Sequence, residues 1–514
     1  MSILLSALVI TLLLATGSQY LLPASLRPRQ PGLHQWKLLA ASISSLYFTG
    51  LLLTQRPVLS AWLTLSILAV LLVVNQAKFR ALREPLIFSD VYLYLQVVRH
   101  PRLFLPFLNI PLTLGALLAG LAFLSLAISL EPAITHWDVK LIYFYPACLL
   151  LLLVSLAATQ ILALQTPLSL DPGHDIQQHG FYNSLLSYTL QAASTTNRQL
   201  LQDTLCNHSP FTTGKTKPLR NSHLIVIQSE SFFDARRLYP GISPNILKNF
   251  DQLKTTSLRH GQLKVPSWGA NTLRPEFAFL SGINNNLLSY YRFNPYQYLQ
   301  QPTPTLVSYL KQQGYYCIAI HPNSAGFFRR DKVFPLLGFD EFIDITDFNP
   351  AHTCGPYISD HAVQQKITAI LEQYQDDSPL FIFVITMENH GPLHLETIHT
   401  DEAKSYYQHS LPKHHNDLSV YLRHLRHADQ MLQDLTDYLQ DYPRDTLLCF
   451  YGDHVPSMPK IYDTLGFSDG HTDYLIWHNQ TPSGIKAGNE RTLQTLSVDA
   501  LAVELINFLQ QNNE

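Results

Sequence analysis

Two short motifs place metal-binding side chains directly after apolar, strand-like runs. Glu230 follows the run HLIVIQ within Ser229-Glu230-Ser231, and Asp453 with His454 follows the run TLLCFY. Carboxylate oxygens combined with one imidazole nitrogen suit Mn²⁺, Zn²⁺ or Mg²⁺. An Asp-His pair after a strand can also simply cap the next helix. The glutamate in the matching place on a second strand favours a metal site.

A hydroxyl nucleophile is available at Thr272, in the segment SWGANTLRPEFAFLSG. Small residues precede Thr272 and an apolar helical stretch follows it, so its hydroxyl is expected at a helix N-terminus. Backbone N–H groups and the helix dipole favour anionic oxygens there, and a bound metal would make the hydroxyl a usable nucleophile. The plainer interpretation is a threonine that caps the helix. Glu276, one turn further on, is expected to anchor the loop or brace the site.

Two further segments follow strand-like runs and carry groups that suit an anionic substrate. The run YYCIAI leads into HPNSAGFFRRD, which begins at His321 and contains Arg330. The run LFIFVI leads into TMENHGP, which contains His390. Arginine binds phosphate oxygens well because its N–H groups form a fork. A single loop histidine usually lies on the surface, but His321, His390 and His454 all come just beyond predicted strands, which favours one shared site.

These motifs require a sheet that brings the ends of several strands together. The strands are predicted near 223–228, 315–320, 380–386, 446–451 and 473–477, and the helices near 303–313, 359–375, 415–440 and 497–511. Alternation of this kind is typical of a mainly parallel sheet with helices on both faces. Ligands bind such sheets at the carboxyl ends of the strands. Residues 221–514 are therefore predicted to form an α/β catalytic domain.

The first third of the chain has a different composition. Charged residues make up 14% of the whole chain, against about 25% in a typical soluble protein. Long uncharged runs of about 20 residues are typical of membrane-spanning helices. Residues 1–165 are therefore predicted to form an α-helical membrane domain, with spans near 3–23, 37–55, 58–76, 108–130 and 141–164. The first run lacks a basic leading region and four more follow, so we interpret it as a retained anchor.

Residues 166–220 are predicted to form a linker. They are rich in proline, glycine and small polar residues, and the stretch 179–193 has apolar residues at helical spacing, which predicts a juxtamembrane helix. Cys206 and Cys354 are predicted in loops and could pair in an oxidising compartment. The acidic C-terminal part has no basic stripe with interleaved aromatic residues, so we expect no nucleic-acid binding.

Basic residues in the loops 25–37 and 77–102 bear on the orientation in the membrane. The positive-inside rule would place both loops in the cytoplasm, and after five spans the C-terminal part would follow them. Alternatively, the cations could bind lipid phosphates beside 84–101, which is predicted to be an interfacial segment. The chemistry of the predicted site favours the second interpretation, with the catalytic domain outside the cytoplasm.

The order and approximate spacing of these motifs resemble the lipoteichoic acid synthase and phosphoglycerol transferase group of the alkaline phosphatase/sulfatase superfamily. The resemblance covers the whole chain and rests on Glu230-Ser231, Thr272 with Glu276-Phe277, His321 with Phe328, Arg330 and Asp331, Asn389-His390, and Gly452-Asp453-His454. Phe328 stands where the synthases usually carry tryptophan, and Arg274 where they often carry an acidic residue. These departures leave the substrate head group open.

The resemblance implies a metal ion, a covalent intermediate and a substrate site. One divalent metal, commonly Mn²⁺, would be bound by Glu230, Thr272, Asp453 and His454, with Zn²⁺ or Mg²⁺ as alternatives. Thr272 would become loaded with the phosphoryl group. The side chains that would hold the phosphate and glycerol groups of the substrate are His321, Arg330 and His390.

The function implied is a metal-dependent transferase anchored in a bacterial inner or plasma membrane. It would move glycerophosphate from the phospholipid phosphatidylglycerol, through a phospho-threonine, to an envelope glycan or a polyglycerophosphate chain. His390 or water would protonate the departing diacylglycerol. The closest alternative is a phosphoethanolamine transferase acting on lipid A or a glycan.

Two other functions are less well supported by the residues. A sulfatase or phosphodiesterase would use water as the acceptor, but sulfatases need an oxidisable cysteine or serine in a C/S-x-P-x-R setting. Thr272-Leu273-Arg274-Pro275 does not provide that setting. A non-catalytic protein that keeps the fold for binding a partner should have lost at least one of the four residues expected to bind the metal.

Overall fold

The computed structural model describes residues 2–90, 110–136, 140–212, 218–466, 469–480 and 493–510. The chain forms two compact units, Met1–Gln199 and Leu200–Glu514. The first contains long apolar helices and the second contains the central sheet. The α-helical N-terminal part followed by an α/β domain confirms the predicted fold class.

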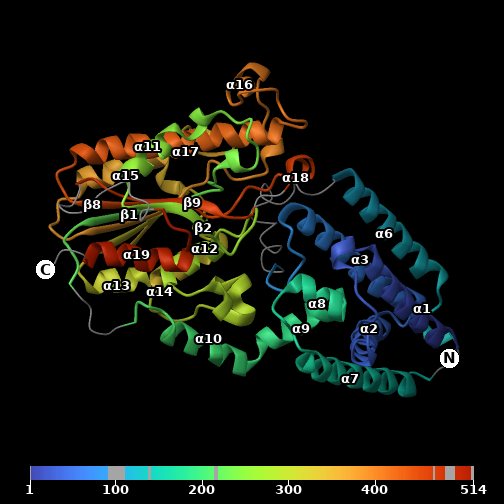
Figure 1. The fold of residues 1–514 in the computed structure, drawn as a ribbon. Helices are drawn as coiled ribbons and strands as arrows, with labels where there is room; N and C mark the ends of the chain where they lie inside the picture. Colours follow the sequence, from blue (N-terminus) through green and yellow to red (C-terminus); the bar gives the residue numbers. More distant parts are fainter. Residues whose placement is uncertain are drawn as a thin grey trace. The chain divides into compact units, whose positions relative to one another are not determined.

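Among the described residues, the first unit contains five long helices (Figure 1). They are α1 (Ser2–Ser18), α2 (Leu33–Thr54), α3 (Pro57–Leu82), α6 (Ile110–Leu130) and α7 (Leu141–Gln165). Helices α2, α3 and α7, and α1 with the turn that follows it, are long and apolar enough to cross a membrane, and α6 contributes the shorter apolar stretch Leu114–Leu130. Five spans were predicted, and the described residues contain four apolar helices of spanning length, with α6 as a shorter fifth.

The distribution of side chains on these helices is the reverse of that in a soluble bundle. On α3, the polar residues Thr64 and Asn75 are buried, whereas Val70 and Val73 are exposed. A helix in lipid gains nothing from hiding apolar residues, and its polar groups need partners inside the protein. The Asn75 Oδ1 atom, for example, accepts a hydrogen bond from the backbone N–H of Leu86 at 2.8 Å.

This unit also contains two shorter helices, α8 (Pro172–His179) and α9 (Phe181–Ala193). The stretch predicted to be helical at 179–193 corresponds to α9, which packs against α2 and α7. The boundary between the units falls within α10 (Thr195–Asn207).

One of the basic residues expected to meet lipid phosphates has a different role. Lys78 is buried and forms ion pairs with Glu84 at 3.1 Å and with Asp90 at 2.6 Å. Its charge is therefore used inside the protein. Most of the predicted interfacial segment 84–101, from residue 91 onward, lies outside the described residues.

The second unit contains an eight-stranded sheet with the order β10-β2-β9-β8-β1-β7-β3-β4. Strands β8, β1, β7, β3 and β4 run parallel, and β9 is antiparallel to both β8 and β2. The bounds are β1 (His223–Ser229), β2 (Arg259–Lys264), β3 (Tyr316–Ile320), β4 (Glu341–Ile343), β7 (Leu380–Ile385), β8 (Thr446–Gly452), β9 (Thr472–His478) and β10 (Leu496–Ser497). All five predicted strands are present.

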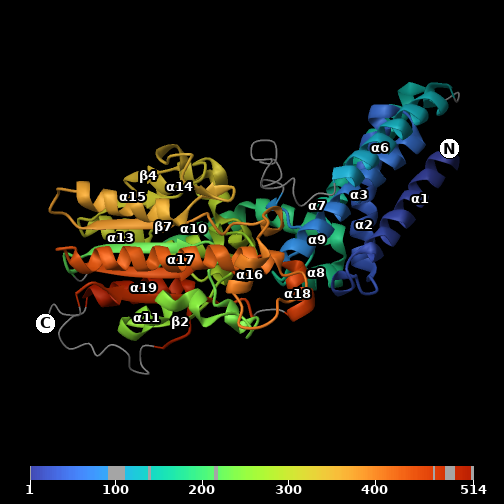
Figure 2. The same ribbon diagram turned by 90° about the horizontal axis from the view of Figure 1, so that it is seen from above.

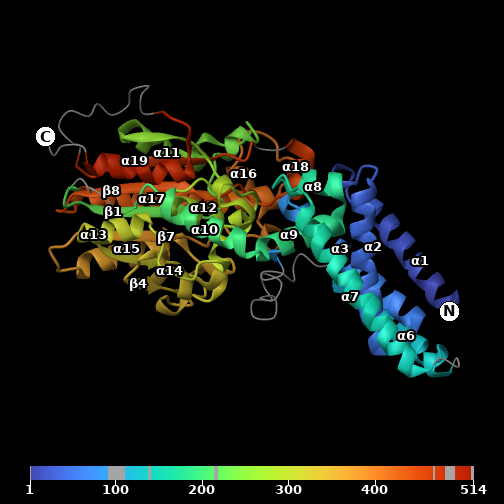
Figure 3. The ribbon, with the colours of Figure 1, turned by 90° about the horizontal axis from the view of Figure 1, so that it is seen from below.

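Helices cover both faces of the sheet (Figure 1). One face carries α11 (Lys248–Thr256), α15 (Asp360–Gln373) and α17 (Asn416–Asp441), the last two side by side in Figure 2. The other face carries α12 (Leu273–Ser281), α13 (Leu306–Gln312), α14 (Arg330–Leu337) and α19 (Val498–Gln510), seen from below in Figure 3. Two short helices, α16 (Thr400–Ser405) and α18 (Pro459–Leu465), lie in the loops.

The central strands are apolar on both sides because both faces are covered. On the α17 side, Ile225 and Ile227 of β1 belong to one large buried cluster with Leu425 of α17. On the opposite side, the ring of Phe279 on α12 stacks on Phe383 and Tyr451. This double packing holds the carboxyl ends of four neighbouring strands in fixed positions.

Cysteine pairing differs from the expectation. All five cysteines lie among the described residues and all are free. Cys206 is exposed on α10. Cys354 lies on β5 (Thr353–Cys354), which forms a small hairpin with β6 (Tyr357–Ile358), and its sulfur faces two histidines of α17. The pairing of Cys206 with Cys354, which the sequence left open, is not formed in this structure.

Candidate active site

The register of the sheet brings Glu230 next to Asp453. Ser229 at the end of β1 pairs with Gly452 at the end of β8, so the next residue on each strand carries a carboxylate at the same edge. Gly452 has to be a glycine, because a Cβ atom there would lie 1.8 Å from the carbonyl oxygen of Phe232. The absence of a side chain lets the chain leaving β1 pass directly over the end of β8.

Glu230, Asp453 and His454 form a compact buried cluster. Their ligand atoms all lie within 4.8 Å of one another. The His454 Nε2 atom is 3.4 Å from Glu230 Oε1 and 3.4 Å from Asp453 Oδ2. Asp453 Oδ2 and His454 Nε2 are buried without a hydrogen-bond partner among the described residues. An unpaired buried polar atom costs about 1–3 kcal/mol, so the arrangement fits a divalent cation that these atoms would bind.

Neighbouring groups orient these three ligands. The His454 Nδ1 atom lies 3.0 Å from the carbonyl oxygen of Val455, so the ring proton is on Nδ1 and the Nε2 lone pair points into the cluster. The Ser231 hydroxyl donates to Glu230 Oε1 at 2.9 Å, and the Ser231 backbone N–H donates to Asp453 Oδ1 at 2.8 Å. Such outer contacts fix the geometry of a metal site.

The electrostatics of the cluster also favour a cation. Burial and the neighbouring carboxylate of Asp453 raise the pKa of Glu230 to about 8. Both effects disfavour a second negative charge in the same small volume. A divalent cation would compensate that charge.

Thr272 immediately precedes α12, and two hydrogen bonds tie its loop to the chain segments that carry the cluster. Gln228 lies on β1, two residues before Glu230, and its Nε2 atom donates to the carbonyl oxygen of Thr272 at 3.3 Å. The N–H of Gly269, in the same loop, donates to the carbonyl of Val455 at 3.0 Å, next to His454. Within the described residues, the Thr272 side chain makes no capping hydrogen bond. The interpretation of Thr272 as a simple helix cap therefore loses its main support.

Arg330 is fully buried and presents one free edge. Its Nε and Nη2 atoms donate to the two oxygens of Glu276 at 3.0 and 2.6 Å. Tyr296 supports the same carboxylate with a hydroxyl bond of 2.7 Å. In the described part of the chain, Arg330 Nη1 has no partner. Glu276 thus braces Arg330, and the remaining N–H group can bind an anionic oxygen.

His321 follows β3 and is buried. Its Nδ1 atom lies 3.1 Å from the carbonyl oxygen of Ile385, which can only accept, so Nδ1 carries the proton. Burial and the nearby charge of Arg330 hold the pKa of His321 well below its usual value. The ring is therefore neutral, and its Nε2 atom is a hydrogen-bond acceptor.

His390 follows β7, the strand next to β1. Its Nδ1 atom lies 2.6 Å from the carbonyl oxygen of Gly391, so the ring proton is again on Nδ1. Burial lowers the pKa of His390. The neutral ring can therefore donate a proton from Nε2 only after it has accepted one there.

Asn389 is a candidate whose role the sequence analysis left open. Its side chain is buried, and neither its Oδ1 nor its Nδ2 atom finds a partner among the residues described. An amide with both functions unused can bind a substrate hydroxyl, which donates and accepts at once. The only signal in the sequence was its position between the strand end and His390.

Comparison with known proteins places the second unit in a family. Residues 222–507, more than half of the chain, match the family model for sulfatases, described as "Sulfatase". The chain belongs to the sulfatase family. The superfamily expected from the motifs is thereby confirmed.

Two relatives of this sulfatase-family chain come from Rhizobium meliloti. The capsular polysaccharide biosynthesis protein RkpI is 28% identical over 473 residues, which cover 86% of this chain and 81% of RkpI. A protein assigned to cyclic beta-1,2-glucan modification is 28% identical over 307 residues, which cover 57% of this chain. The chain spans only 46% of the length of that second relative.

A solved membrane protein has the same architecture over nearly the whole chain. It is the integral membrane lipooligosaccharide phosphoethanolamine transferase A, EptA, from Neisseria meningitidis. The TM-score is 0.53 at 14% sequence identity, covering 94% of this chain and 96% of EptA. This similarity shows the fold: apolar helices followed by a sulfatase-like domain.

Proposed function

We propose that this sulfatase-family chain is a membrane-anchored phosphoglycerol transferase. It takes the glycerophosphate group of phosphatidylglycerol and passes it to a hydroxyl of an envelope glycan. The observation that carries this proposal is a set of buried atoms without hydrogen-bond partners among the described residues. They are Asp453 Oδ2 and His454 Nε2, which follow β8, and Arg330 Nη1 at the start of α14. A phosphate group bound between a cation and Arg330 would satisfy all three.

Each residue of the site has a role in this reaction. Glu230, Asp453, His454 and the Thr272 hydroxyl would hold the metal, Mn²⁺ in our proposal. A divalent cation bound there would lower the pKa of the hydroxyl and neutralise a phosphate oxygen. The free N–H of Arg330 binds a second oxygen of the phosphate.

The transfer proceeds in two displacements. The Thr272 oxygen bonds to phosphorus while the bond from phosphorus to the diacylglycerol oxygen breaks. His390 Nε2 takes the threonine proton and gives it to that oxygen. A glycan hydroxyl then attacks the phospho-threonine, its proton passes to His390, and Thr272 leaves with that proton. His321 and Asn389 bind the glycerol hydroxyls.

The acceptor and the location follow from the relatives and the lipid donor. The names of the two Rhizobium meliloti relatives refer to polysaccharide biosynthesis and to glucan modification. They favour a glycan as the acceptor over a growing polyglycerophosphate chain. In the proposed arrangement, residues 1–165 anchor the enzyme in a bacterial inner membrane, 166–220 connect the two parts, and residues 221–514 act outside the cytoplasm. A lipid donor explains why a catalytic domain needs such an anchor.

A phosphoethanolamine transferase is the second candidate, favoured by the whole-chain similarity in fold to EptA. The phosphate site would be the same for either donor. Only the contacts of the head group beyond the phosphate would differ, and these would involve His321 and Asn389. A hydrolase is the third, with water in place of the glycan.

Mass spectrometry of the Thr272 peptide tests the proposal and separates the candidates. The full-length protein is incubated in detergent with Mn²⁺ and phosphatidylglycerol, or with phosphatidylethanolamine, without an acceptor. We expect a glycerophosphate adduct on Thr272 from the first lipid, and no adduct in Thr272→Ala. A phosphoethanolamine adduct alone would favour the second candidate, and steady release of free glycerophosphate would indicate a hydrolase. Lipid turnover without any adduct would exclude the covalent route.

A further inference from the structure

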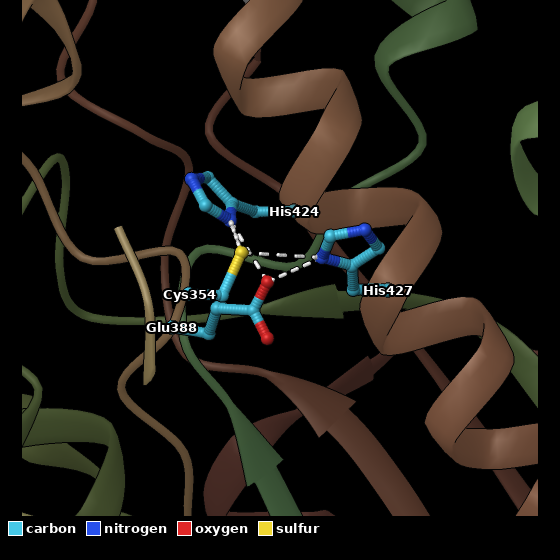
Figure 4. Close-up of side chains that lie close together, drawn as sticks. All are labelled: Cys354, Glu388, His424 and His427. Carbon is cyan, nitrogen blue, oxygen red and sulfur yellow. Dashed lines mark hydrogen bonds and ion pairs between the residues drawn. The ribbon is translucent and has the colours of Figure 1, made fainter. Parts of the chain in front are cut away.

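Four residues that the reaction does not use converge next to the active-site loop (Figure 4). Cys354 lies on β5, Glu388 follows β7, and His424 and His427 lie one turn apart on α17. Their ligand atoms all lie within 4.8 Å of one another. Figure 4 shows both imidazole rings turned toward the same sulfur and the same carboxylate.

The distances are close to those of a tetrahedral metal site. The Cys354 sulfur lies 3.6 Å from His427 Nδ1 and 3.9 Å from His424 Nδ1. Ligands of a tetrahedral zinc ion are roughly 3.3–3.6 Å apart, given its bond lengths to sulfur and nitrogen. One Glu388 oxygen, Oε1, is nearer, at 2.9 Å from His424 Nδ1 and 2.5 Å from His427 Nδ1. If a cation took the place of the protons on the two Nδ1 atoms, Glu388 Oε1 would have to move by less than about 1 Å to reach the spacing of a zinc ligand.

Outer contacts orient the ligands as they do in known metal sites. The other ring nitrogen of His424, Nε2, faces the Glu396 carboxylate at 3.1 and 3.2 Å. A metal-bound histidine usually donates its second N–H to a carboxylate in this way. The second oxygen of Glu388 accepts the backbone N–H of Asp360 at 2.7 Å.

Without a metal ion, the arrangement needs both histidines to carry protons toward Glu388 and Glu396. His424 is fully buried, and contacts with Glu388 and Glu396 on its two nitrogens would need a proton on both. His427 would need a proton on Nδ1 as well, a few ångströms away. The buried Asp360 is adjacent, and its Oδ1 atom has no partner in the described ranges. A cation would replace two of these protons and compensate the acidic groups.

We propose that Cys354, Glu388, His424 and His427 bind a second metal ion, and that this ion is zinc. A thiolate with two imidazoles selects zinc over Mn²⁺ or Mg²⁺, which prefer oxygen ligands. Four protein ligands close the coordination shell, which is typical of a structural ion. Glu388 and His424 are buried, whereas the His427 side chain is 43% exposed, so the ion has a path from solvent.

A zinc ion at this position would stabilise the loop that carries His390. Glu388 lies two residues before His390, in the same loop. Tyr357, on the hairpin that carries Cys354, contacts His390 Nδ1 at 3.2 Å and donates to the carbonyl of Gly391 at 3.1 Å. The ion would therefore link α17 to the β5–β6 hairpin and to the loop after β7. It would fix the position of His390 through that loop and through Tyr357 of the hairpin.

Cobalt substitution tests the proposal directly. The full-length protein is stripped of metal and reloaded with Co²⁺ alone, whose bond to a thiolate gives a charge-transfer band in the near ultraviolet. The active-site ligands contain no sulfur, so they cannot produce this band. We expect the band in the wild type and in Asp453→Asn, which loses only the active-site ion. Cys354→Ser should lose the band and one metal ion per chain, whereas Cys206→Ser, at an exposed free cysteine, should keep both.

A second variant protects the test from folding failure. Glu396→Gln leaves all four ligands in place and removes only the charge behind His424, so zinc affinity should fall about 10–100-fold. A wild-type protein saturated with Co²⁺ but lacking the band would overturn the proposal. So would an undiminished band in Cys354→Ser, or unchanged zinc affinity in Glu396→Gln. Because the readout is metal binding, the result does not depend on the donor or the acceptor of the transfer reaction.

Discussion

Glu276 holds Arg330 through two hydrogen bonds, of 3.0 Å at Nε and 2.6 Å at Nη2, and both side chains are fully buried. Glu276 lies one turn after Thr272 on α12, and Arg330 begins α14. The helix that follows the proposed nucleophile thus also sets the orientation of the arginine. The pair is neutral overall, and the remaining Nη1 atom supplies a fixed donor for an anion.

Replacing Arg330 by lysine should abolish most of the activity while the protein stays folded. A lysine ammonium can pair with Glu276, but it cannot also keep the second bond and present a fixed donor to the phosphate. We expect a loss of about 100-fold or more in kcat/KM, measured with labelled phosphatidylglycerol. Arg329→Lys is the matched control, since the Arg329 side chain donates to the carbonyl oxygen of Gln297 and not to Glu276. Near-normal turnover in Arg330→Lys would make Arg330 a structural residue.

Glu276→Gln should destabilise the second unit as well as impair transfer. The glutamine keeps the size of the side chain but leaves the buried guanidinium without a counter-charge, and such losses cost about 3–5 kcal/mol. Thermal unfolding of the full-length protein in detergent measures this cost. An unchanged unfolding temperature would mean that solvent or another group compensates Arg330.

Thr272→Ala should be inactive, folded and still able to bind metal through the other three ligands. Loss of a capping threonine costs about 1 kcal/mol, but the Thr272 side chain makes no capping bond within the described structure. We therefore expect a smaller loss of stability. Thr272→Ser keeps the hydroxyl without the methyl group that restricts its rotamer, so a reduced rate should remain. Transfer activity that survives in Thr272→Ala would remove the nucleophile assignment.

His223 predicts a loss of stability in mild acid. It is fully buried at the start of β1, and its Nδ1 atom accepts the backbone N–H of Leu380 at 2.8 Å. Burial, with a smaller effect of Arg444, lowers the pKa of His223 to about 4, whereas the unfolded chain should titrate at about 6.5. The unfolded state therefore binds the proton more tightly. The stability due to neutral His223 is complete above about pH 6.5 and is lost as the pH falls toward 4, by about 3 kcal/mol.

The variant His223→Gln isolates this effect, because glutamine can accept the same hydrogen bond but does not titrate. Unfolding in detergent is followed between pH 7.5 and pH 4.5 for both proteins. The wild type should lose more stability over this range than the variant. Equal slopes would show that the acid sensitivity comes from other groups.

The membrane helices and the central strands could be predicted because their signals are local. A run of apolar residues long enough to cross a bilayer, such as α7, is visible in a single window. Strands β1, β7 and β8 each contain a continuous apolar run, since helices cover both of their faces. Strand β2, with the polar sequence RHGQLK, was missed because its pairing with β9 depends on a segment about 200 residues away.

The candidate site, too, could be predicted from the sequence only in part. The sequence alone showed that Glu230, Asp453 and His454 follow strands, and that Thr272 precedes a helix. The register of β1 against β8, the pairing of Glu276 with Arg330 and the unused amide of Asn389 came only from the structure.

Cys354 is the clearest case of what tertiary structure decided. Its sequence context indicated a loop cysteine that could pair with Cys206, whereas the fold sets it against His424 and His427, 70 and 73 residues further along the chain. Local patterns determine which elements form, because hydrophobic periodicity acts over a few turns. Which side chains meet depends on how those elements pack, and no local pattern encodes that.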